Sequence, residues 1–422
     1  MAFPARQVFS TWPLLLGMGM LMLGAGLQGT LIGLRATIEG FPPFVTGVVM
    51  SCYYVGYIGG SAWTPLMMQR VGHIRVFAAL TAVSSVAILL QAVFVTPVWW
   101  GFLRFASGVC FAGIYVVAES WLNGRATNQT RGTLFALYML TLYGGLGGGQ
   151  YLLMAADPRG PMLFVLISVL ISLAVVPMSL SVQRAPEIEV PAKIRYRELY
   201  QLSPMGVVAV IVAGVVSSSL FSMGPVYARL IGLRASDIAT FMGVSILAAV
   251  ITQLPIGRWS DRTDRRTVLI AVCLIALVAA VAGGMIGTIS KLTLFALAAA
   301  FGGIALSLYS LAASHINDHL TADQIVSASS SIVTLNGLGS IAGPLIVSWT
   351  MKQFGPPAYF FSLAVMLGSL VLYAVWRKIQ RGAVPGPLKL PFINVQPQAV
   401  SGQMMAQVAH DAAVAEERAD SV

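Results

Sequence analysis

The sequence predicts an all-α membrane protein, with twelve transmembrane helices arranged as two pseudo-symmetric six-helix bundles. Three observations carry this prediction: long stretches without a charged residue, an apolar composition, and a segregation of Lys and Arg between alternate loops. The chain has 422 residues, of which 57% are hydrophobic and 9% charged, whereas soluble domains are about 25% charged. A bilayer core is about 30 Å thick, so a spanning helix needs roughly 20 mostly apolar residues.

Eleven stretches are long enough to span and contain no Asp, Glu, Lys or Arg. In chain order they are 7–34, 40–69, 76–103, 132–156, 160–183, 199–228, 238–257, 267–290, 292–314, 324–351 and 353–376. The remaining span, 98–120, is fourth in order and carries Arg104 and Glu119. The spans are apolar around most of their circumference, unlike the one-sided helices of soluble proteins. None shows the short alternating segments of a transmembrane β-barrel.

Lys and Arg give the expected orientation, because cytoplasmic loops carry an excess of these residues. One predicted side, which includes both termini, holds eighteen of them, and the other side holds six. The six are Arg35, Arg159, Arg229, Arg234, Lys291 and Lys352. We therefore expect cytoplasmic termini, and we interpret the net charge of +10 as a topology signal that also suits anionic lipid headgroups. No loop offers the basic, aromatic-interleaved surface of a nucleic-acid binder.

The chain divides into two halves that resemble each other. We predict an N-terminal bundle at 8–182, a cytoplasmic linker at 183–203, a C-terminal bundle at 204–378 and a disordered cytoplasmic tail at 379–422. Matching residues recur at an offset of 194, with two more at an offset of 192. The first set pairs Gly108, Tyr115, Ser120, Asn123, Gly145 and Gly149 with Gly302, Tyr309, Ser314, Asn317, Gly339 and Gly343, and the second pairs Arg70 and Val76 with Arg262 and Val268. Such a series indicates a duplication of the kind found in secondary transporters, whose binding site lies between the repeats.

A loop between the eighth and ninth spans, 257–266, reads GRWSDRTDRR. It resembles the G-x-x-x-D-R-x-[GD]-R-R signature of the major facilitator superfamily. The corresponding loop of the first half departs from that signature, with Pro65 in place of the glycine and Gln69 in place of the aspartate. Arg104 and Gly108 resemble the R-x-x-x-G element of the fourth span, and the strings VGHIRVFAAL, AESWLN and PVYARLIGL resemble the YcaD-like bacterial subfamily. The resemblance implies a secondary transporter of a small molecule in a bacterial inner membrane.

The resemblance also assigns a gating role to this loop. The candidate residues are Gly257, Asp261, Arg262, Asp264, Arg265 and Arg266. A helix N-terminus presents unpaired N–H groups and partial positive charge, so Asp261 could dock at the start of the fifth span, around 131–133. The arginines would then clamp nearby carboxylates or carbonyls, and the latch would close the cytoplasmic side. The alternative is a basic loop that serves topology alone.

The fourth span supplies the main candidates for a substrate and proton pathway. Arg104, Tyr115 and Glu119 fall on one helical face, and ionisable groups inside a membrane usually face a bundle interior or a water-filled cavity. We interpret Arg104 as an anion contact and Glu119 as a proton-exchange group. The alternatives are a snorkelling Arg104 near the outer interface and a gate salt bridge from Glu119 to a nearby arginine. Further candidates in other spans are Gln28, Tyr227, Tyr309 and Asn336. Each could instead be an ordinary interhelical hydrogen-bonding residue or an interface aromatic.

Other functional classes find no support in the sequence. No catalytic, metal or cofactor motif is evident, and the phosphate-cradling loop of ATP-driven pumps is missing. Cys52, Cys110 and Cys273 all fall within predicted spans and have no metal-ligand spacing. We therefore expect a monomeric, non-enzymatic transporter whose partners are a small molecule, protons and the bilayer. The alternatives are an uncoupled facilitator, or a membrane receptor or scaffold that uses a transporter fold without transport.

Overall fold

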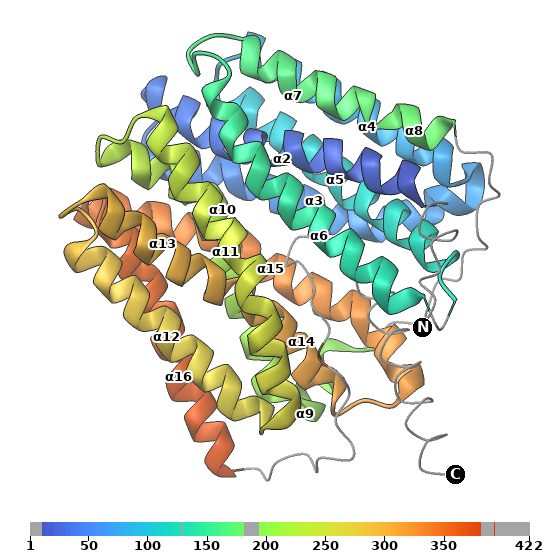
Figure 1. Ribbon diagram of the computed structural model, residues 1–422, viewed down its shortest axis with the longest axis vertical. Helices are drawn as coiled ribbons and strands as arrows, with labels where there is room; N and C mark the ends of the chain where they lie inside the picture. Colours follow the sequence, from blue (N-terminus) through green and yellow to red (C-terminus); the bar gives the residue numbers. More distant parts are fainter. Residues whose placement is uncertain (1–10, 128–129, 181–193, 381–391, 393–422) are drawn as a thin grey trace.

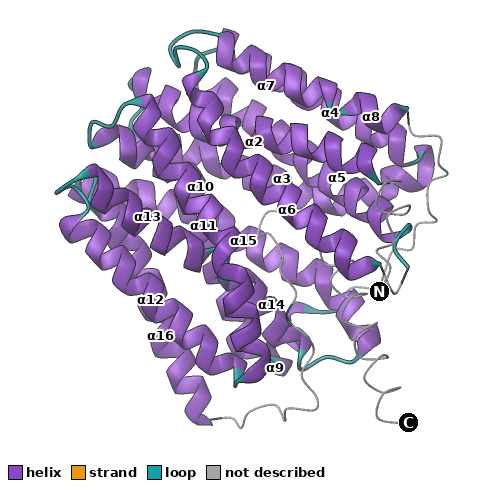
Figure 2. Cartoon of the chain, viewed as in Figure 1, coloured by secondary structure: helices purple, strands orange, loops and turns teal. Residues whose placement is uncertain are grey.

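The computed structural model describes residues 11–127, 130–180, 194–380 and 392, and helices account for nearly all of them (Figure 2). The first half of the chain forms one series of helices. They are α2 (Trp12–Ile38), α3 (Pro43–Val71), α4 (His73–Val93), α5 (Pro97–Asn123), α6 (Arg131–Tyr151), the short 3-10 helix η1 (Leu152–Met154), α7 (Met162–Leu173) and α8 (Val175–Ser179).

The second half begins with a short helix that precedes the first membrane-length helix. Its elements are α9 (Tyr196–Leu202), α10 (Pro204–Leu230), α11 (Ala235–Arg262), α12 (Arg265–Ile286), α13 (Lys291–Ala305), α14 (Leu308–Asn317), α15 (Ala322–Phe354) and α16 (Ala358–Gln380). Figure 1 shows the two halves as neighbouring bundles, with blue to green helices in one and yellow-green to red-orange helices in the other. The tail beyond Gln380, apart from Phe392, and the linker up to residue 193 lie outside the described residues.

Two of the expected spans are interrupted. The sixth is divided into α7 and α8 at Ala174, and the tenth into α13 and α14 at Leu306 and Ser307. Counting each divided pair once, the described residues form twelve membrane-length rods, and ten of these are long and apolar enough to cross a membrane. The other two, α3 and α6, lack a window of sufficient hydropathy. Both bury polar side chains, among them tyrosines and threonines in α3 and tyrosines and a glutamine in α6. The predicted fold class is confirmed.

The internal repeat reappears as equivalent helix contacts. A Cβ atom added to Gly108 of α5 would clash with the carbonyl oxygen of Tyr53 on α3, and one added to Gly302 of α13 would clash with Ser245 on α11. The glycines differ by 194 positions and their partners by 192, as the sequence offsets require. Small residues at such crossings let the helix backbones approach closely. The duplication therefore extends from the sequence to the packing.

A second pair of crossings follows the same rule. Gly149 of α6 lies against the backbone of Leu23 on α2, and Gly343 of α15 lies against the backbone of Val215 on α10. The partners again differ by 192 and the glycines by 194. Each half is thus assembled around the same two glycine-mediated crossings, which fixes the positions of the helices that line the interior.

The rods have two ends, which we name by their charges. The basic face is the end that holds Arg70, Arg75, Arg125, Arg258 and Arg262, and the opposite face is the other end. The first described residue of α2 and the last of α16 both lie at the basic face, because an even number of antiparallel rods separates them.

Three helix pairs make the most extensive contacts between the two bundles. The contacts are Gly33 of α2 with Pro225 of α10, Gly47 of α3 with Ser348 of α15, and Gly147 of α6 with Leu247 of α11. All six residues lie between the middle of their helices and the opposite face. In this conformation the halves are therefore joined closely on the side away from the basic face.

Candidate functional site

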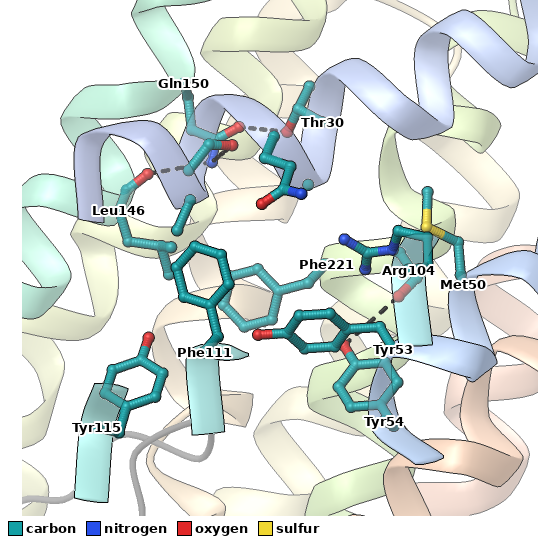
Figure 3. A pocket seen from close by; sticks show the side chains of 15 residues that line it. Thr30, Met50, Tyr53, Tyr54, Arg104, Phe111, Tyr115, Leu146, Gln150 and Phe221 are labelled. Carbon is teal, nitrogen blue, oxygen red and sulfur yellow. Dashed lines mark hydrogen bonds between the residues drawn. The ribbon is translucent and has the colours of Figure 1, made fainter. Parts of the chain in front are cut away.

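A cavity lies about halfway along the rods, where α2, α3, α5 and α6 meet α10 (Figure 3). It encloses about 530 Å³ of space not filled by atoms, counting its open side. Of its fifteen lining residues, thirteen come from α2, α3, α5 and α6, and two come from α10. Three residues singled out from the sequence are among them: Gln28, Arg104 and Tyr115. The cavity therefore belongs mainly to the first half and touches the second at one wall.

Arg104 carries the positive charge of this cavity. It lies seven residues into α5, about 10 Å from the end of the helix, and it is only 5% exposed. Its guanidinium lies over the ring of Tyr53, 4.3 Å from the centroid (Figure 3), which is a cation–π contact. Among the described residues it makes no hydrogen bond or ion pair, and its Nε atom is buried without a partner. The charge is therefore held by an aromatic face instead of a carboxylate.

Polar side chains around Arg104 hold the helices together. The Thr30 hydroxyl donates to Oε1 of Gln150, while Nε2 of Gln150 donates to the carbonyl oxygens of Gly26 at 2.9 Å and Leu146 at 3.1 Å. The bonds to Thr30 and Gly26 connect α6 to α2, whereas the bond to Leu146 lies within α6; dashed lines mark hydrogen bonds in Figure 3. Gln28, by contrast, is 2% exposed and its Nε2 has no hydrogen-bond partner among the described residues.

Hydroxyl groups also lie at the boundary between the halves. The hydroxyls of Tyr54 on α3 and Ser222 on α10 are 3.5 Å apart. Tyr115 donates its hydroxyl to Sδ of Met22 at 3.2 Å. The cavity wall thus contains one polar contact that joins the two bundles, and it is a long one by the usual criteria.

Glu119 lies one helical turn beyond Tyr115, towards the basic face, and is 4% exposed. Four buried phenols are within electrostatic range of its carboxyl group: Tyr57, Tyr115, Tyr138 and Tyr309. Rings also connect this group to the cavity, since Tyr57 lies 6.2 Å from Tyr53 and 6.4 Å from Tyr115 between centroids. The structure therefore brings Tyr309 of the second half close to Glu119 of the first.

Two sequence-predicted residues lie elsewhere. Tyr227 does not line this cavity. It stacks on Tyr359 with centroids 4.9 Å apart and meets Phe360 edge-on. Asn336 donates from Nδ2 to the carbonyl oxygen of Val210 at 3.1 Å and so ties α15 to α10. Both make the interhelical contacts given as their alternative interpretation.

The signature loop lies at the basic face, and two of its arginines, Arg265 and Arg266, form ion pairs within the second half. Arg265 is 1% exposed and donates to Oδ1 of Asp318 at 2.7 Å, to the carbonyl oxygen of Ser314 at 2.9 Å and to Oγ of Ser260 at 2.9 Å. Because the Asp318 side chain is also buried, at 2% exposed, this pair is an internal ion pair that fastens α12 to the end of α14.

Asp264 and Arg266 form a second pair, with N–O distances of 2.8 to 3.2 Å. Asp264 also caps α12 by accepting from the backbone N–H of Arg266 at 3.0 Å. Partial burial alone would raise the pKa of this carboxyl. The hydrogen bonds and charge of Arg266 outweigh that effect, and the pKa of Asp264 falls below its usual value.

Asp261 is 42% exposed and has a different neighbour from the expected one. Its Oδ1 accepts from the backbone N–H of Phe392 at 2.7 Å and lies 3.3 Å from Arg265. The ring of Phe392 lies against Gly257, where a Cβ atom would clash with it. Among the described residues Asp261 therefore makes no hydrogen bond or ion pair with the start of α6 in this conformation, and docking at residues 131–133 stays a prediction. Arg262 ends α11 beside this group.

Sequence reasoning missed several residues of the site. Tyr53, Tyr54 and Gln150 line the cavity, and Asp318 completes the buried ion pair. A signal existed for the tyrosines, because three phenols within five residues of α3 are unusual for a lipid-facing helix. No sequence signal pointed to Asp318, which lies 53 residues from its partner.

Comparison with known proteins identifies the family. The family model described as Major Facilitator Superfamily matches residues 14–290 and, in a second match, residues 206–406. The chain belongs to the major facilitator superfamily. It is therefore a multi-pass membrane transporter, and the superfamily resemblance is confirmed.

Relatives and solved structures agree with this assignment. An uncharacterised MFS-type transporter, YcaD, of Escherichia fergusonii is 27% identical over 83% of this chain and 91% of its own length. YcaD of Salmonella typhi is 26% identical over 89% and 97%. A mutant of the nucleoside transporter NupG has a TM-score of 0.74 at 12% identity, over 87% of this chain and all of that one. A bacterial homologue of the lysosomal transporter Spinster, in an inward-facing and unoccupied conformation, has a TM-score of 0.63 at 11% identity, over 98% and 99%. These structures share the fold of this chain.

Proposed function

We propose that the protein is a secondary active transporter that moves a small molecule across a bacterial inner membrane by alternating access, driven by protons. The observation that carries this proposal is the cavity at the boundary of the two bundles, which contains a buried arginine and has Phe221 and Ser222 of the second half as one wall. A site between two repeats is what rocking of one repeat against the other can expose to each side in turn.

The rocking units are residues 8–182 and 204–378, joined by the linker 183–203. With the positive-inside rule, the basic face and both termini are cytoplasmic. The three crossings between the halves then lie on the periplasmic side, so this conformation faces inward. The cavity is complete within one chain, which supports a monomeric transporter.

Glu119 is the proposed proton carrier. A carboxyl group buried within a membrane span, among phenols of both halves, exchanges protons at lower cost than it can hold a charge there. Tyr57, Tyr115 and Tyr309 connect it to the cavity and to the second half. Asp261 and the arginines of the signature loop are the proposed cytoplasmic latch, which forms across the halves when the transporter faces outward.

Distance measurements between spin labels test this proposal without a known substrate. One pair, Arg75→Cys and Arg258→Cys, reports on the basic face, and a second, Val98→Cys and Ile289→Cys, on the opposite face. All four positions are exposed, and Cys52, Cys110 and Cys273 are replaced by alanine. We expect the first distance to shorten and the second to lengthen in the same fraction of molecules as the pH is varied. Two distances that never change, or that change in the same direction, would rule out alternating access.

The proton carrier is tested in the same system. Glu119→Gln fixes a neutral side chain, so the pH-dependent redistribution should disappear, whereas the matched variant Glu39→Gln, at an exposed position, should retain it. A redistribution that survives in Glu119→Gln would remove this residue from the coupling mechanism while leaving alternating access in place.

A further inference from the structure

We propose that the transported molecule is an organic monoanion, a carboxylate or sulfonate on a largely apolar or aromatic body, and that Arg104 and Gln28 bind its anionic group. This inference rests on the proposed transport function and names its substrate class. It depends on three features of the cavity: an uncompensated charge, a surplus of hydrogen-bond donors, and aromatic walls.

The charge of Arg104 is uncompensated. The titratable groups in electrostatic range of its guanidinium are Tyr53, Tyr54 and Cys52, all neutral at pH 7 by their ordinary pKa values. A buried charge without a counter-charge is unfavourable, and a ring face recovers only a part of that cost. An anion that enters the cavity supplies the missing counter-charge, and a planar guanidinium binds carboxylate or sulfonate oxygens through two parallel hydrogen bonds.

Within the part of the chain that the structure describes, two hydrogen-bond donors of the cavity have no acceptor. Nε of Arg104 and Nε2 of Gln28 are both buried and unpartnered among the described residues, and both residues line the cavity. Gln150 and Thr30 also line the cavity, but their side chains already form hydrogen bonds with each other and with backbone carbonyl groups. A site with unused N–H groups selects a ligand that is rich in acceptors, because unpaired buried donors are costly.

The aromatic residues that line the cavity indicate the chemical character of the uncharged part of the ligand. Tyr53, Tyr54, Phe111, Tyr115 and Phe221 line the cavity with aromatic rings (Figure 3). A small inorganic anion would leave these rings facing empty space or water, whereas an apolar or aromatic body would pack against them. Arg104 is the one cation among the lining residues. A second anionic group would therefore lie unpaired, which favours a single negative charge.

Binding to the purified wild-type protein tests the charge selectivity. Benzoate and benzenesulfonate are compared with benzamide, with benzyltrimethylammonium and with inorganic phosphate by thermal shift, since a ligand of the native state raises its melting temperature. We expect the two aromatic anions to raise it and the neutral, cationic and inorganic compounds to leave it unchanged. If the amide or the cation stabilises the protein as well as the anions do, the inference is wrong. This comparison needs no variant and does not depend on how any mutant folds.

Variants locate the site. Arg104→Gln should weaken benzoate binding by about tenfold or more, and Arg104→Lys, which keeps the charge but loses the planar fork, should lie between that variant and wild type. Arg75→Gln removes the same charge from an exposed position at the basic face and should bind benzoate as wild type does. Unchanged affinity in a folded Arg104→Gln variant would place the anion elsewhere and overturn the inference.

A transport assay tests the anion-binding site and the proposed transport function separately. Proteoliposomes are assayed for uptake of radiolabelled benzenesulfonate, whose permanent charge prevents leakage of a neutral acid, with protein-free liposomes as the control. Uptake that is lost in Arg104→Gln supports both proposals. Selective anion binding without any flux would contradict transport but leave the anion site intact. Uptake of the cation that is unaffected by Arg104→Gln would leave transport intact and overturn the anion site.

Discussion

The start of α12 in the second half corresponds to the start of α4 in the first half. Different interactions stabilise the two helix starts. In the second half Asp264 caps α12, Arg265 donates to the carbonyl oxygen of Ser314, and Asp318 neutralises Arg265. The equivalent positions of the first half, at offsets of 192 and 194, are Gly72, His73, Ser120 and Gly124. His73 Nε2 there lies 2.9 Å from Oγ of Ser120, and Gly72 begins α4 at a φ of +88° without a side-chain cap.

The comparison shows how a duplicated fold divides its tasks. The second half has its buried charges at the basic face, where the ion pair of Arg265 and Asp318 fixes the ends of α12 and α14. The first half keeps a hydrogen bond between His73 and Ser120 there, and its buried charged residues, Arg104 and Glu119, lie within α5. Their counterparts in the second half, at an offset of 194, are Ala298 and Ala313. The packing is common to both halves, but the ionisable chemistry is distributed in opposite ways.

Removing one partner of the buried ion pair should have the largest effect. Asp318→Asn leaves Arg265 as a buried charge without its full counter-charge, and such a change costs about 3–5 kcal/mol. We expect a large drop in the unfolding temperature of the detergent-solubilised protein. Glu39→Gln, which breaks the i,i+4 pair of Arg35 and Glu39, is the control and should cost under about 1 kcal/mol. Equal effects of the two variants would show that the buried pair is not the stronger fastening.

The shared glycine crossings should respond equally in stability but not in binding. Gly108→Ala and Gly302→Ala each force a methyl group against the backbone of a neighbouring helix, which costs about 1–3 kcal/mol. Gly108 lies against Tyr53, the residue that holds Arg104, so its variant should also weaken ligand binding. Unfolding and benzoate titration of both variants measure these effects. A loss of stability confined to one half would contradict the structural symmetry.

His73 offers a smaller test of the same comparison. His73→Ala removes one neutral hydrogen bond and should cost about 1 kcal/mol, well below the cost of Asp318→Asn. The double variant His73→Arg with Gly124→Asp transplants the charged pair into the first half, and we expect it to unfold at a higher temperature than either single variant. A double variant no better than the singles would show that the equivalence stops at the backbone.

The smallest effect concerns the cap of α12. Asp264→Ala loses a side-chain N-cap, worth about 1 kcal/mol, together with the pair to Arg266. Because the pKa of Asp264 is lowered in the folded protein, its contribution is full above the ordinary carboxyl pKa near 3.9 and is lost as the pH falls through the lowered value. The difference between wild type and variant should be constant from neutral pH down to about 5 and should shrink below about 4. A difference that grows with acidity would reverse this assignment.

The fold was largely predictable because lipid imposes strong rules on a chain. Charge-free stretches of spanning length gave the rods, and the offsets of 192 and 194 indicated the duplication that recurs in the glycine crossings. The breaks in the sixth and tenth spans escaped prediction. The break in the sixth span had a signal in the sequence, because Pro177 cannot donate to the carbonyl oxygen of Leu173 and its ring crowds that group. The break in the tenth span falls at Leu306 and Ser307, which are neither proline nor glycine.

The site was only partly predictable. An ionisable residue within an apolar span stands out in a sequence, so Arg104 and Glu119 were identified as candidates. A tyrosine that faces a cavity looks the same in sequence as one that packs between helices, which is why Tyr53 was missed and Tyr227 was named. Long-range pairs such as Arg265 with Asp318 depend on how rods come together, and one sequence alone does not contain that information.

Thirteen of the fifteen residues that line the cavity belong to the first bundle. This uneven distribution has an energetic consequence for the transport cycle. A bound anion would form nearly all its favourable contacts with α2, α3, α5 and α6, and would keep them while α10 swings away. The hydroxyl contact of Tyr54 with Ser222, at 3.5 Å, is weak enough to break and reform in every cycle. The ligand would then move together with the first bundle during the transport cycle, and its binding affinity would differ little between the two sides of the membrane. A carrier of that kind lets the driving gradient, and not a change in binding strength, decide the direction of flow.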